Sequence, residues 1–149
     1  MIMLAKKITL SIESQYHNVQ LVSAAVHKLC SLIPLSDKDA HKTELCVTEA
    51  VVNSIKHAYQ DEPDHTVVVT FCLLTSELVI VVRDSGKSMD LDLLAEKRDA
   101  ALKFDSSDIE NLPESGRGLA IIQSYMDEVH YKVKENGNYL TMKKKIEQS

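Results

Sequence analysis

The sequence has no apolar stretch that could cross a membrane. Its run from Leu78 to Val82 is far shorter than the roughly 20 residues that a spanning helix requires. The amino terminus places Lys6 and Lys7 after a very short apolar piece, so it lacks the hydrophobic centre of a signal peptide. We therefore expect a cytoplasmic protein that does not associate with membranes.

The chain also lacks an excess of basic residues and a regular cysteine pattern. Seventeen Lys and Arg stand against twenty-two Asp and Glu, and the formal charge of −5 argues against direct binding of nucleic acids. Cys30, Cys46 and Cys72 are odd in number and show no C-x-x-C spacing, which indicates neither a disulfide framework nor a zinc site. We expect all three to be buried free thiols.

The composition is that of an ordinary globular protein, and the length is that of a single domain. The 149 residues are 44% apolar and 26% charged, as is usual for soluble domains. A chain of this size buries about two thirds of the surface that its unfolded form exposes, which is enough for a hydrophobic core. We expect a single domain over residues 1–149.

Apolar periodicity predicts the order of strands and helices. The predicted elements are a strand over 7–14, a helix over 19–32, a helix from Ser36 to Tyr59, a hairpin with strands over 66–74 and 78–83, a helix from Gly118, and a hairpin with strands over 129–134 and 139–145. Asn136-Gly137 suits a type I′ turn in the last hairpin. Hairpin strands with helices gathered on one face predict an α+β fold, a two-layer α/β sandwich with a mixed, mostly antiparallel sheet.

Residues 84–115 interrupt this regular order. The stretch carries many charges, Gly86 and Pro113, although Leu91 to Phe104 could form a short helix within it. We expect a flap over about residues 87–115 more than a bare linker, because long segments of this kind in compact domains often cover a binding site.

Glu49, Asn53 and His57 form a polar line on the second predicted helix. Residues four apart are displaced by only about 40° around a helix, so the three share one face. A solvated polar stripe would give the same spacing. The surrounding positions are apolar, however, and unpaired polar groups are costly in a mostly buried helix. These apolar neighbours are Val47, Ala50, Val51, Ile55 and Ala58.

Two glycine-containing turns follow the polar line. Asp84-Ser85-Gly86 comes directly after a predicted buried strand, where a carboxylate can accept an amino proton from a purine. Ser115-Gly116-Arg117-Gly118-Leu119 opens a predicted helix, whose free amide groups can hold phosphate oxygens. Each turn alone is common. The third glycine of a dinucleotide fingerprint and the G-x-x-x-x-G-K-[ST] motif are both missing, which excludes Rossmann and P-loop readings.

Taken in order, these motifs resemble the GHKL ATPase superfamily of gyrase, Hsp90, histidine kinases and MutL, whose ATP-binding domain has the Bergerat fold. The resemblance covers about Thr43 to Met142, and the stretch from Glu49 to Tyr59 is its most specific part. Lys56-His57-Ala58-Tyr59, Gly116-Arg117-Gly118-Leu119 and the segment 125–129 are most similar to the RsbW and SpoIIAB type of anti-sigma-factor serine kinase.

The resemblance implies a role for each matching residue. Asn53 would coordinate Mg²⁺ that bridges the phosphates of ATP, and Asp84 would bind the adenine amino group. Glu49 would be the general base that orients a serine hydroxyl of a protein substrate. The remaining matches are implied to contact the nucleotide: Gly86 and Thr141 beside the adenine, Gly116, Arg117, Gly118 and Leu119 near the phosphates, and Lys56 and His57 near phosphate or ribose, where they could also simply cover the helix.

Two positions depart from the superfamily pattern. Ser88 replaces the second glycine of Asp-x-Gly-x-Gly, a substitution related to one that is familiar in the RsbW branch. Arg117 stands where aliphatic residues are common, and could meet phosphate, an acidic surface of a partner, or solvent.

The function that the resemblance implies is an ATP-dependent serine kinase. It would phosphorylate a STAS-domain anti-anti-sigma factor, sequester a sigma factor, and form a homodimer for which the edge of strand 7–14 is a plausible seam. One alternative is a nucleotide-gated binding module without catalysis. Another is the detached ATP-binding part of a sensor histidine kinase, for which His17 and His27 are the only upstream phosphoacceptor candidates.

Overall fold

The computed structural model describes residues 6–89 and 114–146, and the side chains of residues 114–116 are not described. Its elements, in chain order, are β1 Lys6–Glu13, η1 Tyr16–Asn18, α1 Val19–Ser31, α2 Asp37–Asn53, η2 Ser54–Ala58, β2 Thr66–Leu73, β3 Glu77–Asp84, α4 Glu114–Tyr125, β4 Glu128–Lys134 and β5 Gly137–Lys145. Most of the predicted flap, with the helix predicted over Leu91–Phe104, lies outside the described residues.

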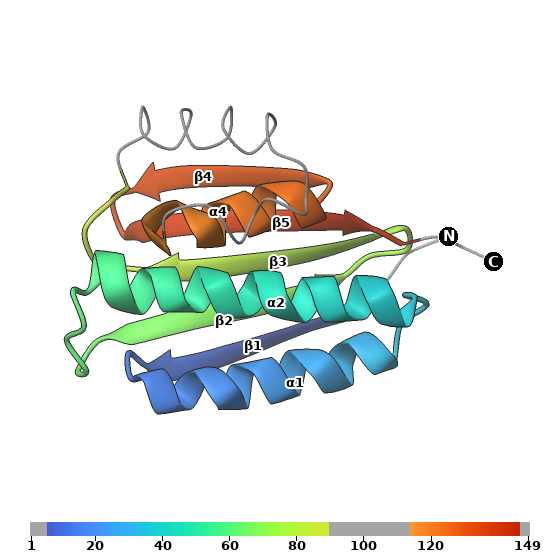
Figure 1. Cartoon of the computed structure of the whole chain (residues 1–149), viewed down its shortest axis with the longest axis horizontal. Helices are drawn as coiled ribbons and strands as arrows, with labels where there is room; N and C mark the ends of the chain where they lie inside the picture. Colours follow the sequence, from blue (N-terminus) through green and yellow to red (C-terminus); the bar gives the residue numbers. More distant parts are fainter. Residues whose placement is uncertain (1–5, 90–113, 147–149) are drawn as a thin grey trace.

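The strands form one sheet, and the helices lie on one of its faces (Figure 1). The strand order is β1-β2-β3-β5-β4, and every pairing among the described strands is antiparallel. The predicted α+β sandwich is therefore confirmed, with an antiparallel sheet in place of the mixed one. β1 is an edge strand that pairs with β2 alone among the described residues.

The core lies between the sheet and the helices. β2 and β3 alternate buried and half-buried residues because successive side chains of a strand point to opposite faces. Residues that are fully buried in this layer include Val22, Val26, Val47, Val51, Ile55, Val67, Val69, Leu78, Ile80, Ile122 and Met142. β1 contributes less, since Ile8 is 42% exposed and only Leu10 and Ile12 pack against the core.

The second helix begins as its sequence predicts and ends differently. The Ser36 hydroxyl caps it by accepting a hydrogen bond from the Asp39 amide at 3.1 Å. After Asn53 the chain turns into the π-helical segment η2, where the Tyr59 amide donates to the Ser54 carbonyl at 3.0 Å. Short π-helical turns of this kind are frequent at functional sites.

The last hairpin has a different turn from the predicted one. Lys134 pairs with Gly137, so the two loop residues are Glu135 and Asn136. Among the described non-glycine residues only Gln60 and Asp61 have positive φ, which excludes a type I′ turn through Asn136. Gly137 has φ +149°, and its Cβ would lie 2.7 Å from the Asp84 carbonyl oxygen, so glycine is required there for both reasons.

The cysteines are free, as predicted, although Cys72 is only half-buried. Burial raises the pKa of Cys30 to about 11 and that of Cys46 to about 12, so both remain thiols at neutral pH. Among the described helices, none combines the length and the apolar character that a bilayer-spanning segment needs.

Candidate functional site

A small cavity opens beside the carboxyl-terminal half of α2. Its volume is about 60 Å³, below the roughly 300–1,000 Å³ of ordinary ligand pockets, so a whole nucleotide would extend beyond it. The walls come from α2, η2, β3 and the segment after it, α4, β4 and β5. The lining residues are Ala50, Asn53, Ser54, His57, Ala58, Val82, Asp84, Lys87, Met89, Leu119, Tyr131, Asn138 and Leu140.

Asp84 is the buried carboxylate of this cavity, with 9% of the residue exposed. Its Oδ1 accepts hydrogen bonds from the Gly86 amide at 3.1 Å and from Asn138 Nδ2 at 2.8 Å. Its Oδ2 accepts the Ser54 hydroxyl at 2.9 Å. A carboxylate offers about four lone-pair positions, so the described residues leave one acceptor position, on Oδ2, for a ligand.

Asn138 is a site residue that the sequence analysis missed. It is 3% exposed, and its Nδ2 donates to Asp84 and to the Gly86 carbonyl at 3.0 Å. Its Oδ1 accepts the Ser88 hydroxyl at 3.0 Å. The register of β3 against β5 pairs Asp84 directly with Asn138. An inward-facing polar residue two positions before Leu140 was the signal that could have identified it.

The prediction that Thr141 belongs to this site is wrong, because Thr141 faces away from the cavity. Asn138 and Leu140 line the cavity and Met142 is in the core, so strand alternation turns Thr141 to the opposite face of the sheet. A shift of one residue along a strand exchanges its two faces, and the predicted position falls on the outer one.

Gly86 is required for packing between two chain segments. A Cβ at this position would lie 2.3 Å from the Ala58 carbonyl oxygen and 2.6 Å from its carbon. The same carbonyl accepts the Lys87 amide at 2.9 Å. The absence of a side chain thus allows the turn after β3 to close onto the end of η2, in addition to any approach of a ligand.

Beside Asn53, Gly118 brings α4 against α2. A Cβ on Gly118 would lie 2.8 Å from Glu49 Oε2 and 3.5 Å from Asn53 Oδ1. α4 begins at Glu114, four residues before the predicted start, so Gly118 is its fifth residue and its amide lies inside the helical ladder. Gly116 and Arg117 occupy the first turn, where amide groups have no helical partner.

Glu49 is half-buried on α2, and this burial raises the pKa of its carboxyl above the ordinary value. The positive charge of Arg117, itself half-buried, opposes the shift without cancelling it. A carboxylate with a raised pKa is a stronger base when it is ionised. The structure therefore brings a basic carboxylate, an amide side chain and a guanidinium together beside the cavity, and Asn53 is the one of the three that lines it.

Comparison with known proteins identifies the family of the chain. Residues 12–144 match the family model described as histidine kinase-like ATPase domain. The chain belongs to this family. This confirms the GHKL resemblance that the motifs indicated.

Several curated relatives of this ATPase-family chain carry the name serine-protein kinase RsbW. The Bacillus velezensis protein is 30% identical over 129 residues, covering 87% of this chain and 78% of that protein. The Staphylococcus epidermidis protein is 33% identical over 129 residues, covering 86% and 79%. The Listeria monocytogenes protein is 29% identical over 123 residues, covering 83% and 77%.

A solved structure has the same fold at low sequence identity. A chain of the SiaB–SiaC complex from Pseudomonas aeruginosa superposes with a TM-score of 0.67. The match covers 97% of this chain and 89% of that chain, with 13% identical residues. It supports the two-layer architecture of the ATPase-family domain.

Apart from Gly116 and Arg117 in the first turn of α4, the predicted site residues fall into three groups in this ATPase-family structure. Asn53, His57, Asp84 and Leu119 line the cavity. Glu49 and Gly118 contact each other beside it, and Gly86 supports it from the turn. Lys56 is exposed and is not among the residues that line the cavity, and Thr141 faces away from it.

The donor groups present suit Mg²⁺ and ATP. Glu49 and Asn53 each place an oxygen atom within 3.5 Å of the position that a Cβ of Gly118 would occupy, and Mg²⁺ prefers oxygen ligands. The free acceptor position on Asp84 suits an amino group of a base. The apolar walls contributed by Val82, Leu119 and Leu140 suit a flat aromatic ring.

Proposed function

We propose that this chain is an ATP-dependent protein serine kinase that acts on a STAS-domain anti-anti-sigma factor and also serves as an anti-sigma factor. The observation that carries the proposal is the pairing of a buried acceptor, Asp84, which lines the cavity, with a basic carboxylate, Glu49, which lies beside the cavity next to Asn53 and Gly118. Relatives named serine-protein kinase support the same reaction.

The proposed roles follow from the position of each group. Asp84 accepts the adenine amino group while the Gly86 amide and Asn138 orient its carboxylate. Asn53 is one turn of α2 beyond Glu49, about 6 Å along the axis, and would hold Mg²⁺. When bound, Mg²⁺ would neutralise the negative charge of the phosphates, and this is a main requirement of phosphoryl transfer.

Glu49 accepts the proton of the incoming serine hydroxyl in this proposal. Its raised pKa suits a base, and positioned acid or base groups contribute about 10²–10⁴-fold to rate. Arg117 lies close enough to influence the charge of Glu49, so it contributes to tuning this base. Lys56 and His57 are on η2 beside Asn53, and we place them near the phosphate or ribose.

The proposal extends to the partners and the assembly. A STAS-domain substrate presents the serine, a sigma factor is the second client, and the kinase is a homodimer. The open edge of β1 favours a symmetric contact, because an unpaired strand edge is a ready template for pairing. Light scattering of the purified chain measures the assembly directly.

The decisive experiment is transfer of radiolabelled phosphate from ATP to the cognate STAS-domain protein in the presence of Mg²⁺. We expect label on a serine with the parent chain and none with Glu49→Gln, which should keep most of its nucleotide affinity. Asn53→Ala should instead lose affinity for Mg·ATP in calorimetry.

Glu44→Gln is the matched control for this experiment. It makes the same chemical change on the same helix, but Glu44 bonds Ser23 and His27 of α1 outside the cavity. It should retain transfer. Nucleotide binding without any transfer by the parent chain would instead identify a non-catalytic, nucleotide-gated binding module.

A further inference from the structure

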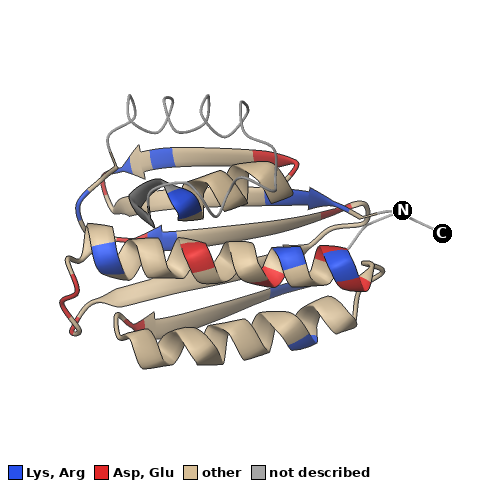
Figure 2. Ribbon diagram, viewed as in Figure 1, with Lys and Arg blue, Asp and Glu red and all other residues tan. Residues whose placement is uncertain are grey.

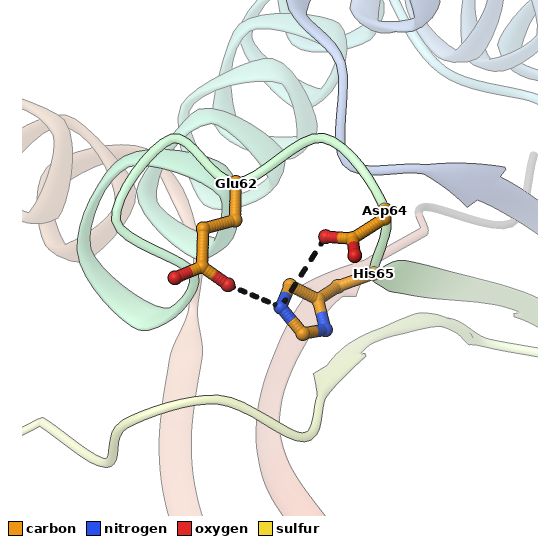
Figure 3. Close-up of side chains that lie close together, drawn as sticks. All are labelled: Glu62, Asp64 and His65. Atoms are coloured by element: carbon orange, nitrogen blue, oxygen red, sulfur yellow. Dashed lines mark hydrogen bonds and ion pairs between the residues drawn. The ribbon is translucent and has the colours of Figure 1, made fainter.

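A second group of ligand-type side chains lies in the loop between η2 and β2, away from the nucleotide cavity. Glu62, Asp64 and His65 each offer one donor atom, and these atoms lie within 4.8 Å of one another (Figure 3). His65 Nε2 is 2.7 Å from Glu62 Oε2 and 3.7 Å from Asp64 Oδ1. One imidazole nitrogen and two carboxylates therefore converge within four consecutive residues.

The imidazole ring of His65 is held in this orientation from behind. It stacks on the Tyr59 ring with a centroid separation of 4.6 Å and an interplanar angle of 11°. Tyr59 is itself 5% exposed, and its hydroxyl donates to the Thr66 carbonyl at 2.6 Å and accepts the Ser85 amide at 2.7 Å. The ring that supports His65 is thus fixed by its burial and by two hydrogen bonds at its hydroxyl.

The backbone of the loop is also fixed at both ends of the group. The buried Ser14 hydroxyl donates to the Glu62 carbonyl and accepts the His65 amide at 3.2 Å. The Ser14 amide donates to the His65 carbonyl at 2.8 Å. These contacts involve atoms other than the three donors, so occupation of the group would not require them to break.

The surroundings of the group are acidic. Asp61 precedes it in the loop, and Figure 2 shows the connection between α2 and β2 dominated by acidic residues. The three donor side chains remain accessible: 41% of His65, 61% of Glu62 and 81% of Asp64 is exposed. Negative charge and accessibility both favour a cation that approaches from solvent.

We propose that Glu62, Asp64 and His65 form a binding site for a divalent first-row transition metal ion, with Zn²⁺ as the representative. The site is separate from the Mg²⁺ position proposed beside Asn53. Ligands of a tetrahedral Zn²⁺ at 2.0–2.2 Å are separated by about 3.4 Å, which the two measured separations bracket. Water completes the coordination on the exposed side.

The donor set distinguishes this metal class from the alkaline-earth ions. An imidazole nitrogen suits Zn²⁺, Ni²⁺ and Cu²⁺, whereas Mg²⁺ and Ca²⁺ prefer oxygen ligands only. Binding displaces the hydrogen bond between His65 and Glu62, because the metal takes the position of the proton between them. Millimolar Mg²⁺ should therefore leave Zn²⁺ binding unchanged.

The test is calorimetric titration of the full-length, tag-free chain with ZnCl₂ in the absence of nucleotide. We expect one ion per chain, and a reduction of affinity by about tenfold or more in both His65→Gln and Glu62→Gln. Glu62→Gln is the variant least able to disturb folding, because its side chain is largely exposed.

Two control variants separate this site from other ligands of the chain. His130→Gln removes an imidazole of a second exposed pair, since His130 Nε2 is 3.3 Å from Glu128 Oε2. Cys72→Ser removes the half-buried thiol. Both should bind Zn²⁺ as the parent does. Absence of stoichiometric binding in the parent, or equal binding in the parent, His65→Gln and Glu62→Gln, would overturn the proposal.

Discussion

At the Asp84 end of the site, Asp84 and Asn138 line the cavity, are buried and are hydrogen-bonded to each other, whereas at the Glu49 end, beside Gly118, the residues Glu49, Asn53 and Arg117 remain half-buried. The first end is completed by folding, because its polar groups satisfy one another and leave a single acceptor position for a base. The second end keeps its charge and its amide accessible for chemistry. Partial burial raises the pKa of Glu49, which reflects the free energy needed to keep a charged carboxylate at this end.

This contrast predicts that the two ends respond differently to substitution. Changes at the Asp84 end that disturb the two hydrogen bonds to Oδ1 should lower stability and nucleotide affinity together, since these bonds support the fold and orient the carboxylate. Changes at the Glu49 end should lower phosphoryl transfer while leaving stability equal or higher, as is common where active sites retain unfavourable groups.

The largest expected effect is that of Glu49→Gln on transfer. Loss of the base should reduce the rate of phosphoryl transfer to the STAS-domain protein by about 10²–10⁴-fold. Steady-state kinetics with saturating Mg·ATP measures this loss. A variant that retains more than half of the parent rate would remove Glu49 from the mechanism.

The same substitution should change stability in a pH-dependent way. Because the folded-state pKa of Glu49 is raised, the folded chain binds more protons than the unfolded chain between the two pKa values, so stability falls as pH rises through that window. Glu49→Gln removes the titratable carboxyl and therefore also removes this pH-dependent loss of stability. Urea unfolding should find the variant more stable than the parent at about pH 8, with the gain disappearing below the ordinary pKa of glutamate.

Gly86→Ala should have the next largest effect, and it should be structural. The new methyl would meet backbone atoms of Ala58, which cannot move without displacing η2. We expect a loss of about 1–3 kcal/mol in the free energy of unfolding, as for other overpacked sites. Nucleotide affinity should fall with it, because the turn that carries Asp84 must shift. Denaturant unfolding and calorimetry measure the two losses.

Gly118→Ala is the counterpart at the opposite end. Its methyl would meet the Glu49 carboxylate, the end of a flexible side chain, so the free energy of unfolding should change little. Transfer should nevertheless fall by about 10-fold to 100-fold, because the base is displaced from its position. If Gly118→Ala unfolds as readily as Gly86→Ala, the two ends do not differ in the proposed way.

Much of the architecture could be predicted because its signals are local. Alternation of apolar and polar residues predicted the strands, and the Ser36 cap predicted the start of α2. The spacing of four residues predicted that Glu49 and Asn53 share one helix face. These patterns act within a few residues, where propensity and periodicity are informative.

The features that were missed depend on partners that are distant in sequence. The predicted helix begins at Gly118, whereas α4 begins at Glu114 and packs on α2 with Gly118 as a buried contact. Asn138 was missed and Thr141 predicted instead because the register of β5 against β3 decides which residues face the cavity.

Asn138→Ala should have an intermediate effect at the Asp84 end. It removes one donor to the carboxylate and leaves the Ser88 hydroxyl without its partner. We expect a loss of about 2 kcal/mol in the free energy of unfolding, in the range for hydrogen bonds to charged groups. Thr141→Ala is the matched control, on the same strand but the outer face, and should keep nucleotide affinity.

Ser54→Ala should have the smallest effect, and it separates two roles of the Asp84 hydrogen bonds. The hydroxyl is a donor to Oδ2, while the two bonds that orient the carboxylate go to Oδ1 and remain in the variant. We expect a loss of about 1 kcal/mol in stability, as for one buried hydrogen bond. Nucleotide affinity measured by calorimetry should change by less than about threefold, because removing the donor frees an acceptor position on the atom that faces the base. A drop in affinity as large as that of Asn138→Ala would mean that Oδ2, not Oδ1, sets the orientation of Asp84.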